Sequence, residues 1–356
     1  MPSSSTRLAV VGALIGLVLL VAMAPALGET PDPPVPLFDE SRLHDEPLAL
    51  EISAPWRQLR RRPDDEGPFP ATLQMDGLAS PLALSVEKRG VSRQQVCSMP
   101  PIRLRFDEEQ VEGTRFEGNR SIKVVTHCQR GGRYEQYVVL EFLAYRLYSV
   151  LTDVSFRVRP VTIVYSDSER GRSDGPRIAF LIEDDRLVGN RHGLDKVDID
   201  EIGPSDLPSV ETSLFMLYQY MIGNVDFSPL SATDGECCHN AKLIGDESTL
   251  EPLYAVPYDF DSSGWVDTEY AAPPEGLPIR DVRQRLFRGF CRHNDGLPAA
   301  RQQILAKREA LYRLLADESR LSRRNQSRAE RYLEDFFNTL ADDERFERAI
   351  TGRCRS

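Results

Sequence analysis

The spacing of apolar residues predicts a β-rich first half. Between residues 48 and 106, short apolar-polar alternations (LALEIS, FPATLQM, LALSVEK, IRLRF) are separated by turn-forming residues, which is typical of antiparallel strands. The runs SIKVVTH, VRPVTIVY and RIAFLIED predict three more strands. One helix is expected within this half, from Tyr134 to about Leu151, where apolar residues recur with a 3.6-residue period.

From Ser209 onward the pattern becomes mostly helical. The run ETSLFMLYQYMI predicts an apolar helix that ends at Gly223, and AKLIG and EPLYAVPYDF predict short strands. Charged amphipathic helices are expected over 279–290, 299–315 and 321–350. We therefore expect an α+β protein with a β-rich domain over residues 48–207 and a helical domain over residues 208–356.

The N-terminus has the pattern of an export signal. A short basic start precedes 17 apolar residues (8–24), and Ala26 and Gly28 offer small residues for cleavage. Residues 1–28 therefore predict a secretory signal peptide, and the Pro-rich residues 29–47 a tether. We expect a periplasmic or extracellular protein. The alternative is an uncleaved segment that anchors the chain, because this apolar run is just long enough to span a membrane.

The charge balance excludes one class of partner. The chain has 55 acidic and 44 basic residues, with a net charge of −11 at pH 7. Nucleic-acid binding requires a basic surface, so no nucleic-acid partner is expected.

Six cysteines in an exported chain favour disulfides. We expect Cys97 to pair with Cys128, and either Cys237 or Cys238 to pair with Cys291, because strain usually prevents vicinal cysteines from pairing with each other. The cysteine sulfurs themselves, together with nearby histidine nitrogens, could also bind zinc. No pair has the Cys-x-x-Cys spacing of a structural zinc site, so no zinc is expected.

Four polar residues in the run from Gly223 to Gly264 suggest a phosphoryl-transfer site. Asp226 follows the apolar helix, Asn240 precedes a strand, and Asp259 and Asp261 follow another strand at positions that point the same way. In phosphoryl transfer a carboxylate orients the attacking hydroxyl, and an amide and a carboxylate hold Mg²⁺ or Mn²⁺. Each residue also has a structural interpretation, as a turn-forming Asx residue or a solvated acid.

Three further residues could complete such a site. Lys123 in a strand and Glu141 in the following helix predict the ion pair that fixes a cation over nucleotide phosphates. Glu183, at the end of RIAFLIED, could border the nucleotide. Each again has a structural alternative, as an edge-strand lysine, a solvated helix residue or a strand-end acid.

These motifs occur in an order that resembles a known family. VEKRGVSR, then LEFLAYRLYSVL, then GNVDFS…HN…VPYDFDSSG are together similar to the series in the spore-coat-protein-H (CotH) kinase family, a divergent branch of the protein-kinase-like fold. The resemblance implies a bilobal fold and phosphorylation of proteins with ATP and Mg²⁺ or Mn²⁺. It assigns Asp226 as the catalytic Asp, Asn240 and Asp259 as metal ligands, Asp261 as an accessory ligand and Glu141 as the helix Glu.

The leading interpretation is therefore an exported kinase that phosphorylates a protein hydroxyl. Arg103 or Arg105 is the alternative to Lys123 as the cation that contacts phosphate, because MPPIRLRF stands where the family has a Lys-Lys-Pro-Tyr stretch. Because exported compartments hold little ATP, a catalytically inactive kinase-like module for binding or envelope assembly is the second interpretation. A hydrolase that uses the same carboxylates, a metal and a water nucleophile is the third.

Overall fold

The computed structural model describes residues 1, 35–39, 46–61, 67–90, 92–231 and 237–356. The predicted signal segment, apart from Met1, and most of the predicted tether lie outside the described residues. The chain divides into two units, Met1–Pro33 and Pro34–Ser356, and the fold below is that of the second unit.

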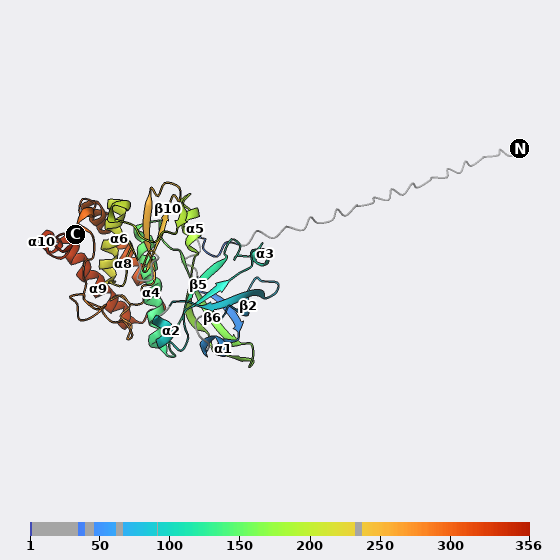
Figure 1. Cartoon of the computed structure of the whole chain (residues 1–356). Coiled ribbons are helices and arrows are strands. Elements are labelled where there is room, and N and C mark those ends of the chain that lie inside the picture. Colours follow the sequence, from blue (N-terminus) through green and yellow to red (C-terminus); the bar gives the residue numbers. More distant parts are fainter. Residues whose placement is uncertain (2–34, 40–45, 62–66, 91, 232–236) are drawn as a thin grey trace. The chain divides into compact units, whose positions relative to one another are not determined.

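The first half of this unit is a closed mixed β-barrel, of which β2, β5 and β6 are labelled in Figure 1. Its strands run in the order β1-β2-β3-β4-β5-β8-β6, and β7 extends the sheet beyond β6. Six neighbouring pairs are antiparallel, and β1 closes the barrel by pairing parallel to β6. The strands are β1 (Leu48–Ala54), β2 (Phe69–Met75), β3 (Leu82–Lys88), β4 (Ile102–Arg105), β5 (Ser121–Val125), β6 (Val158–Asp167), β7 (Arg172–Ser173) and β8 (Arg177–Ile182).

Alternating burial shows which strand residues fill the barrel. In β2 every second residue is buried, as the sequence pattern predicts. Strand β5 is buried on both faces: Ile122 and Val124 belong to the barrel core, whereas Val125 belongs to a second core outside the barrel. The outer face of β5 is therefore covered, and Lys123, which alternates with the inward residues, points to that covered side.

The helix predicted at Tyr134–Leu151 is confirmed as α4 (Gly132–Leu151), which packs against β8. It is buried along most of its length because its apolar residues join the second core. The other helices of this half are short: α1 (Trp56–Arg61), α2 (Ser92–Val96), α3 (Glu108–Val111) and α5 (Asp185–Asn190).

The second half combines a small sheet with helices. The sheet has the order β11-β10-β9 and contains both short strands predicted there. The predicted helix over 299–315 is divided into two helices, and so is that over 321–350. The elements are β9 (Asp195–Val197), α6 (Ser209–Ile222), β10 (Ala241–Gly245), β11 (Leu253–Pro257), α7 (Leu297–Ala306), α8 (Arg308–Ala316), α9 (Arg323–Ala341) and α10 (Asp343–Ala349), with 3₁₀ turns at Pro204–Asp206, Cys291–His293 and Thr351–Arg353.

The prediction of a helix over 279–290 is wrong, because this segment is irregular. Two of its four arginines bond to main-chain oxygens of other segments. Arg285 donates to the oxygen of Met221 at 3.1 Å, and Arg288 donates to that of Phe227 at 3.1 Å. The segment thus caps the end of α6 and the loop that carries Asp226.

The two predicted domains share a hydrophobic core that lies outside the barrel. The predicted boundary between residues 207 and 208 falls just before α6, and α6 packs in the same core as α4 from the first half. The structure therefore supports an α+β unit with two cores, one inside the barrel and one around α4 and α6.

The six cysteines form three disulfides. The predicted pair Cys97–Cys128 is confirmed, whereas the prediction that Cys291 pairs with Cys237 or Cys238 is wrong. Cys291 pairs with Cys354, because the main-chain N–H of Cys291 bonds to the oxygen of Arg355 at 2.8 Å and brings the C-terminus alongside. Cys237 and Cys238 pair with each other.

These disulfides indicate an oxidising, exported environment. In the described ranges, no helix is long and apolar enough to cross a membrane.

Candidate functional site

A cleft of about 1020 Å³ brings five of the predicted site residues together. It is lined on one side by β4 and β5 of the barrel and on the other by the loops before β10 and after β11. The predicted residues that line it are Lys123, Asp226, Asn240, Asp259 and Asp261. Residues that are more than a hundred positions apart in the sequence thus face one volume.

Asp226 is held in place by the end of α6 and by the loop before β10. The helix ends at Gly223, whose φ of 63° is left-handed, and the Asn224 side chain accepts a hydrogen bond from the Asp226 N–H at 3.0 Å. Asn240 donates from Nδ2 to the Asp226 main-chain oxygen at 2.7 Å and to its carboxylate at 3.2 Å. His239 Nε2 lies 2.8 Å from the other carboxylate oxygen. The predicted catalytic Asp and metal-binding Asn therefore touch directly.

Two of the predicted metal ligands have unusual backbone conformations. Asn240 has a φ of 50° and Asp259 a φ of 62°, a region that Asn and Asp tolerate better than other non-glycine residues. The N–H of Asp259 donates to the hydroxyl of Tyr145 on α4 at 2.9 Å. Such backbone conformations persist only where the surrounding structure enforces them, and they are concentrated at functional sites.

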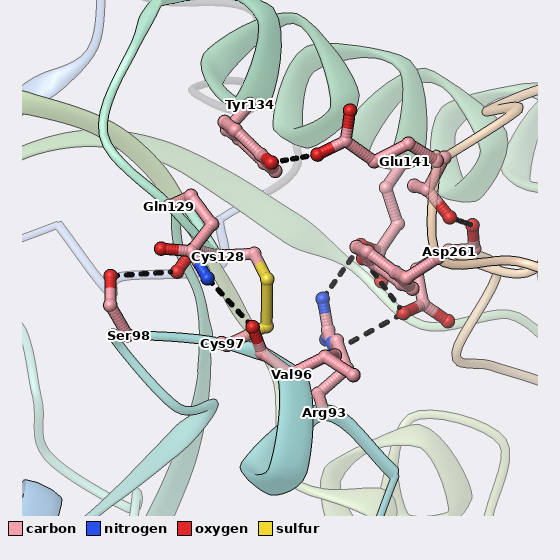
Figure 2. Close-up of a disulfide and its surroundings, with 12 residues drawn as sticks. Arg93, Val96, Cys97, Ser98, Cys128, Gln129, Tyr134, Glu141 and Asp261 are labelled. Carbon is pink, nitrogen blue, oxygen red and sulfur yellow. Dashed lines mark hydrogen bonds and ion pairs between the residues drawn. A yellow bond between two sulfur atoms is a disulfide. The ribbon is translucent and has the colours of Figure 1, made fainter.

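An arginine that the sequence did not single out faces the predicted metal ligands. Arg93 Nε lies 3.2 Å from an oxygen of Asp261, and its two Nη atoms lie 3.6 Å from Glu141 and 3.7 Å from Asp259. Figure 2 shows this guanidinium directed at Glu141 and Asp261. Arg93 is 7% exposed, so these ion pairs are shielded from water.

The Cys97–Cys128 disulfide fixes the short helix that carries Arg93 (Figure 2). Cys97 directly follows α2, and Cys128 lies just after β5. The main-chain oxygen of Cys128 also accepts hydrogen bonds from Met99 N–H and from the Ser98 hydroxyl, both at 3.2 Å. A five-residue helix cannot hold its own position, so these links to the barrel position α2.

Burial dominates the electrostatics of this cluster. It raises the pKa of Glu141 from 4.5 to about 8, although Arg93 opposes the shift. Burial likewise raises the pKa of Asp261, again against the effect of Arg93. For Arg93, burial would lower the pKa, but Asp261 and Glu141 outweigh it and the pKa lies well above its ordinary value. The cluster thus has more carboxylates than cations in a dry environment.

The predicted ion pair between Lys123 and Glu141 is wrong, because each has a different partner. Lys123 Nζ lies 3.0 Å from Asp185 Oδ1, at the start of α5, and 5.2 Å from the centre of the Tyr258 ring. Burial lowers the pKa of Lys123, and Asp185 offsets part of the shift. The lysine still lines the cleft, whereas Glu141 pairs with Arg93 below it.

Glu183 is buried away from the cleft lining. Its carboxylate lies 2.6 Å from Arg191 Nη2 and accepts a hydrogen bond from the Arg157 N–H at 2.6 Å. The following residues, Asp184 and Asp185, line the cleft instead. Glu183 therefore joins the end of β8 to neighbouring segments.

Of the basic residues of the cleft, the sequence pattern indicated Lys123, Arg103 and Arg105, and it did not indicate the others. Arg103 and Arg105 are two positions apart on β4 and so share a face, and Arg103 is directly opposite Lys123 in the sheet. The run from Lys88 to Arg93, with three basic residues at and just after the end of β3, is a sequence signal that could have indicated Arg93. The cationic residues of the lining are Arg89, Arg93, Arg103, Arg105, Arg120, Lys123, Arg186, Lys196 and Lys242.

The oxygen ligands for a metal are present, but a cation of the chain faces them. Among the described residues, no group of three or more His, Cys, Asp or Glu side chains is arranged to hold a metal ion. Oδ1 of Asp259 and Oε1 of Glu141 are buried and accept no hydrogen bond from any described residue, so both retain capacity for a hard cation. The donor set fits Mg²⁺ or Mn²⁺ in kind, with Arg93 as the competing cation.

Comparison with known proteins gives no family model that matches the chain and no match among curated proteins. The function is therefore inferred from the side chains that line the cleft. Asp226 is partly exposed and can accept a proton from a hydroxyl group, while the basic wall opposite can hold an anion.

Proposed function

We propose that this protein is an exported, kinase-like enzyme that transfers a phosphoryl group from ATP to a protein hydroxyl. The observation that carries the proposal is the contact of Asp226 with Asn240 in a cleft that also contains Asp259 and Asp261. The opposite wall is basic, which suits the phosphates of a nucleotide. The order of these residues also resembles the series in the CotH kinase family.

Each residue has a role in the proposal that follows from its position. Asp226 orients the attacking hydroxyl and accepts its proton. Asn240, one of the proposed metal ligands, holds Asp226 in place with its side-chain hydrogen bond. Lys123 and Arg103, neighbours on β5 and β4, contact the phosphates. Glu141 acts through Arg93 rather than through Lys123.

The proposed metal ligands are Asn240, Asp259 and Asp261. A bound Mg²⁺ or Mn²⁺ supplies positive charge that neutralises the phosphate oxygens during transfer. The disulfides and the export-signal pattern support a periplasmic or extracellular location.

The direct test is a phosphotransfer assay on the exported chain with its disulfides intact. The chain is incubated with γ-labelled ATP, Mg²⁺ or Mn²⁺, and acidic and basic carrier proteins. Loss of the catalytic carboxylate should lower the transfer rate by about 10²- to 10⁴-fold. Asp226→Asn and Asp259→Asn should both show this loss. The matched control Asp343→Asn, at an exposed side chain of α10, should leave the rate unchanged. Transfer that survives both cleft substitutions contradicts the site assignment.

A second candidate function is supported by Arg93. Its guanidinium already neutralises the carboxylates that a metal would need, which favours a catalytically inactive module that binds an anionic ligand in the cleft. In that case the chain binds ATP without metal and labels no protein. Release of free phosphate without protein labelling would instead indicate the metal-dependent hydrolase.

A further inference from the structure

A second, separate pocket lies at one end of the barrel. Its volume is about 370 Å³, and no residue lines both this pocket and the cleft. Its lining comes from the segments that follow β1 and β5, from the end of β6, and from β7. Because β1 and β6 are parallel and both end here, their following segments meet at this end of the barrel.

This pocket is strongly basic, in a chain that is acidic overall. We name it the arginine pocket after the six arginines in its lining: Arg57, Arg60, Arg61, Arg130, Arg170 and Arg172. Among the described residues, the carboxylates that line it are those of Asp167 and Asp174. Since the whole chain carries a net charge of −11, this local excess of positive charge runs against the composition.

The two aspartates do not neutralise the arginines. Asp174 pairs with Arg130 at 3.0 Å. The Asp167 carboxylate accepts main-chain N–H groups, at 3.3 Å from Arg57, 3.1 Å from Glu169 and 3.1 Å from Arg170. Within the described ranges, the side chains of the other five arginines form no ion pair with a carboxylate.

The floor of the arginine pocket is rigid and partly apolar. Trp56, Met99 and Tyr165 are buried in it, and the Trp56 and Tyr165 rings meet edge to face with centres 5.1 Å apart. The Tyr165 hydroxyl donates to the hydroxyl of Thr126 at 2.8 Å, which lies 3.1 Å from His127 Nδ1. A fixed floor with charged side chains around its rim is the form of a small-ligand site.

His127 is a buried ring of the pocket lining, and its pKa is lowered. Burial lowers its pKa to about 4, and nearby arginines, Arg177 first among them, add to the shift. The imidazole is therefore neutral at pH 7 and lines the pocket without adding charge. A bound anion would favour the protonated ring and raise this pKa.

We propose that the arginine pocket is a binding site for a compact polyanion that carries phosphate-type oxyanion groups. Five guanidinium groups that have no carboxylate partner among the described residues surround a volume that suits one small ligand. Guanidinium matches phosphate oxygens in bidentate geometry. Repulsion among these arginines is relieved when an anion lies between them. The site is independent of the phosphotransfer proposed for the cleft.

The test is calorimetric titration of the full chain with pyrophosphate at low ionic strength. Arg60→Gln combined with Arg170→Gln should weaken binding about tenfold or more. Both side chains are exposed, so the variant should keep the wild-type melting temperature. The matched control is Arg313→Gln with Arg348→Gln, which removes the same charge from two exposed positions on other helices. Citrate in place of pyrophosphate tells whether phosphate is preferred over carboxylate.

Two further measurements separate this pocket from the cleft. Arg103→Gln with Arg105→Gln removes charge from the cleft and should leave one pyrophosphate site intact. The pKa of His127, followed by NMR, should rise by about one unit with pyrophosphate in the wild type but not in the Arg60/Arg170 variant. No binding at millimolar pyrophosphate, or equal weakening in the Arg313/Arg348 control, overturns the proposal. A His127 pKa that does not change when pyrophosphate is added to the wild type overturns it as well.

Discussion

Arg93 Nε lies 3.2 Å from Oδ2 of Asp261, so a buried cation of the chain itself holds a carboxylate that the sequence assigns to a metal. The same guanidinium reaches Glu141 and Asp259. One arginine therefore links the short helix α2, the long helix α4 and the loop after β11.

Arg93→Met should destabilise the protein strongly. The substitution leaves buried carboxylates without their cation, and breaking a buried ion pair in this way costs about 3–5 kcal/mol. Denaturant unfolding measures the loss. Arg313→Met, which removes an exposed helix pair with Glu309, should cost less than about 1 kcal/mol. Equal losses in the two variants would contradict the role of Arg93.

Glu141 should make the stability of the protein depend on pH. Its pKa is about 8 in the folded chain and near 4.5 when unfolded, so between these values the folded state keeps a proton that the unfolded state has lost. This contribution is complete below pH 4.5 and is lost as the pH rises toward 8. The free energy of unfolding should fall by about 1.4 kcal/mol per pH unit for one such proton.

Glu141→Gln removes this proton and isolates its effect. The difference in unfolding free energy between wild type and variant should change across pH 5 to 8. For the exposed control Glu309→Gln, the difference from wild type should stay constant. A constant difference for Glu141→Gln would show that the carboxyl is not buried as described.

The Cys97–Cys128 disulfide and Arg93 should be energetically coupled, because the disulfide positions α2. Chain entropy alone predicts a loss of about 4 kcal/mol for removal of either Cys97–Cys128 or Cys291–Cys354. In a double-mutant cycle with Arg93→Met, the Cys97→Ser/Cys128→Ser variant should show a coupling of about 0.5–3 kcal/mol. The Cys291→Ser/Cys354→Ser variant should show none. Equal coupling in the two cycles would mean that α2 does not depend on its disulfide.

Gly223→Ala should disturb the loop that carries Asp226. Gly223 is left-handed, and an added Cβ would collide with the hydroxyl of Tyr332 and lie 3.5 Å from Gly264. The backbone penalty alone is about 1–2 kcal/mol, and overpacking adds about 1–3 kcal/mol. Gly276→Ala is the matched control, because its φ is also positive but nothing lies within 4 Å. Thermal unfolding should rank the wild type above Gly276→Ala, and Gly276→Ala above Gly223→Ala.

The sequence predicted those features that depend on local patterns. The helical runs of α4 and α6 and the alternation in β2 are properties of single segments, and the structure confirms the two helices and the alternation. Asp226 and Asn240 were found because each stands where a regular element ends or begins. Such positions are loops that the core holds in place, which is where chemistry-bearing side chains gather.

The features that the sequence did not predict depend on long-range contacts. Arg93 lies on a five-residue helix with no periodic signal, and its partners are distant in the chain. The sequence pairs Lys123 with Glu141 because a strand lysine followed by a helix glutamate is typical of a kinase site, but Lys123 pairs with Asp185 at 3.0 Å. The irregular segment over 279–290 has a helical composition, which its arginine bonds to main-chain oxygens override.

The parallel pairing of β1 with β6 governs the order in which the barrel can form. Residues 55–157 separate the two strands. One edge of β1 therefore stays unpaired until the chain has been synthesised through residue 167 and β6 has paired with β1. An open strand edge invites pairing with other chains. A nascent or truncated form that ends before β6 is therefore exposed to aggregation, and the complete barrel has no such open edge at β1.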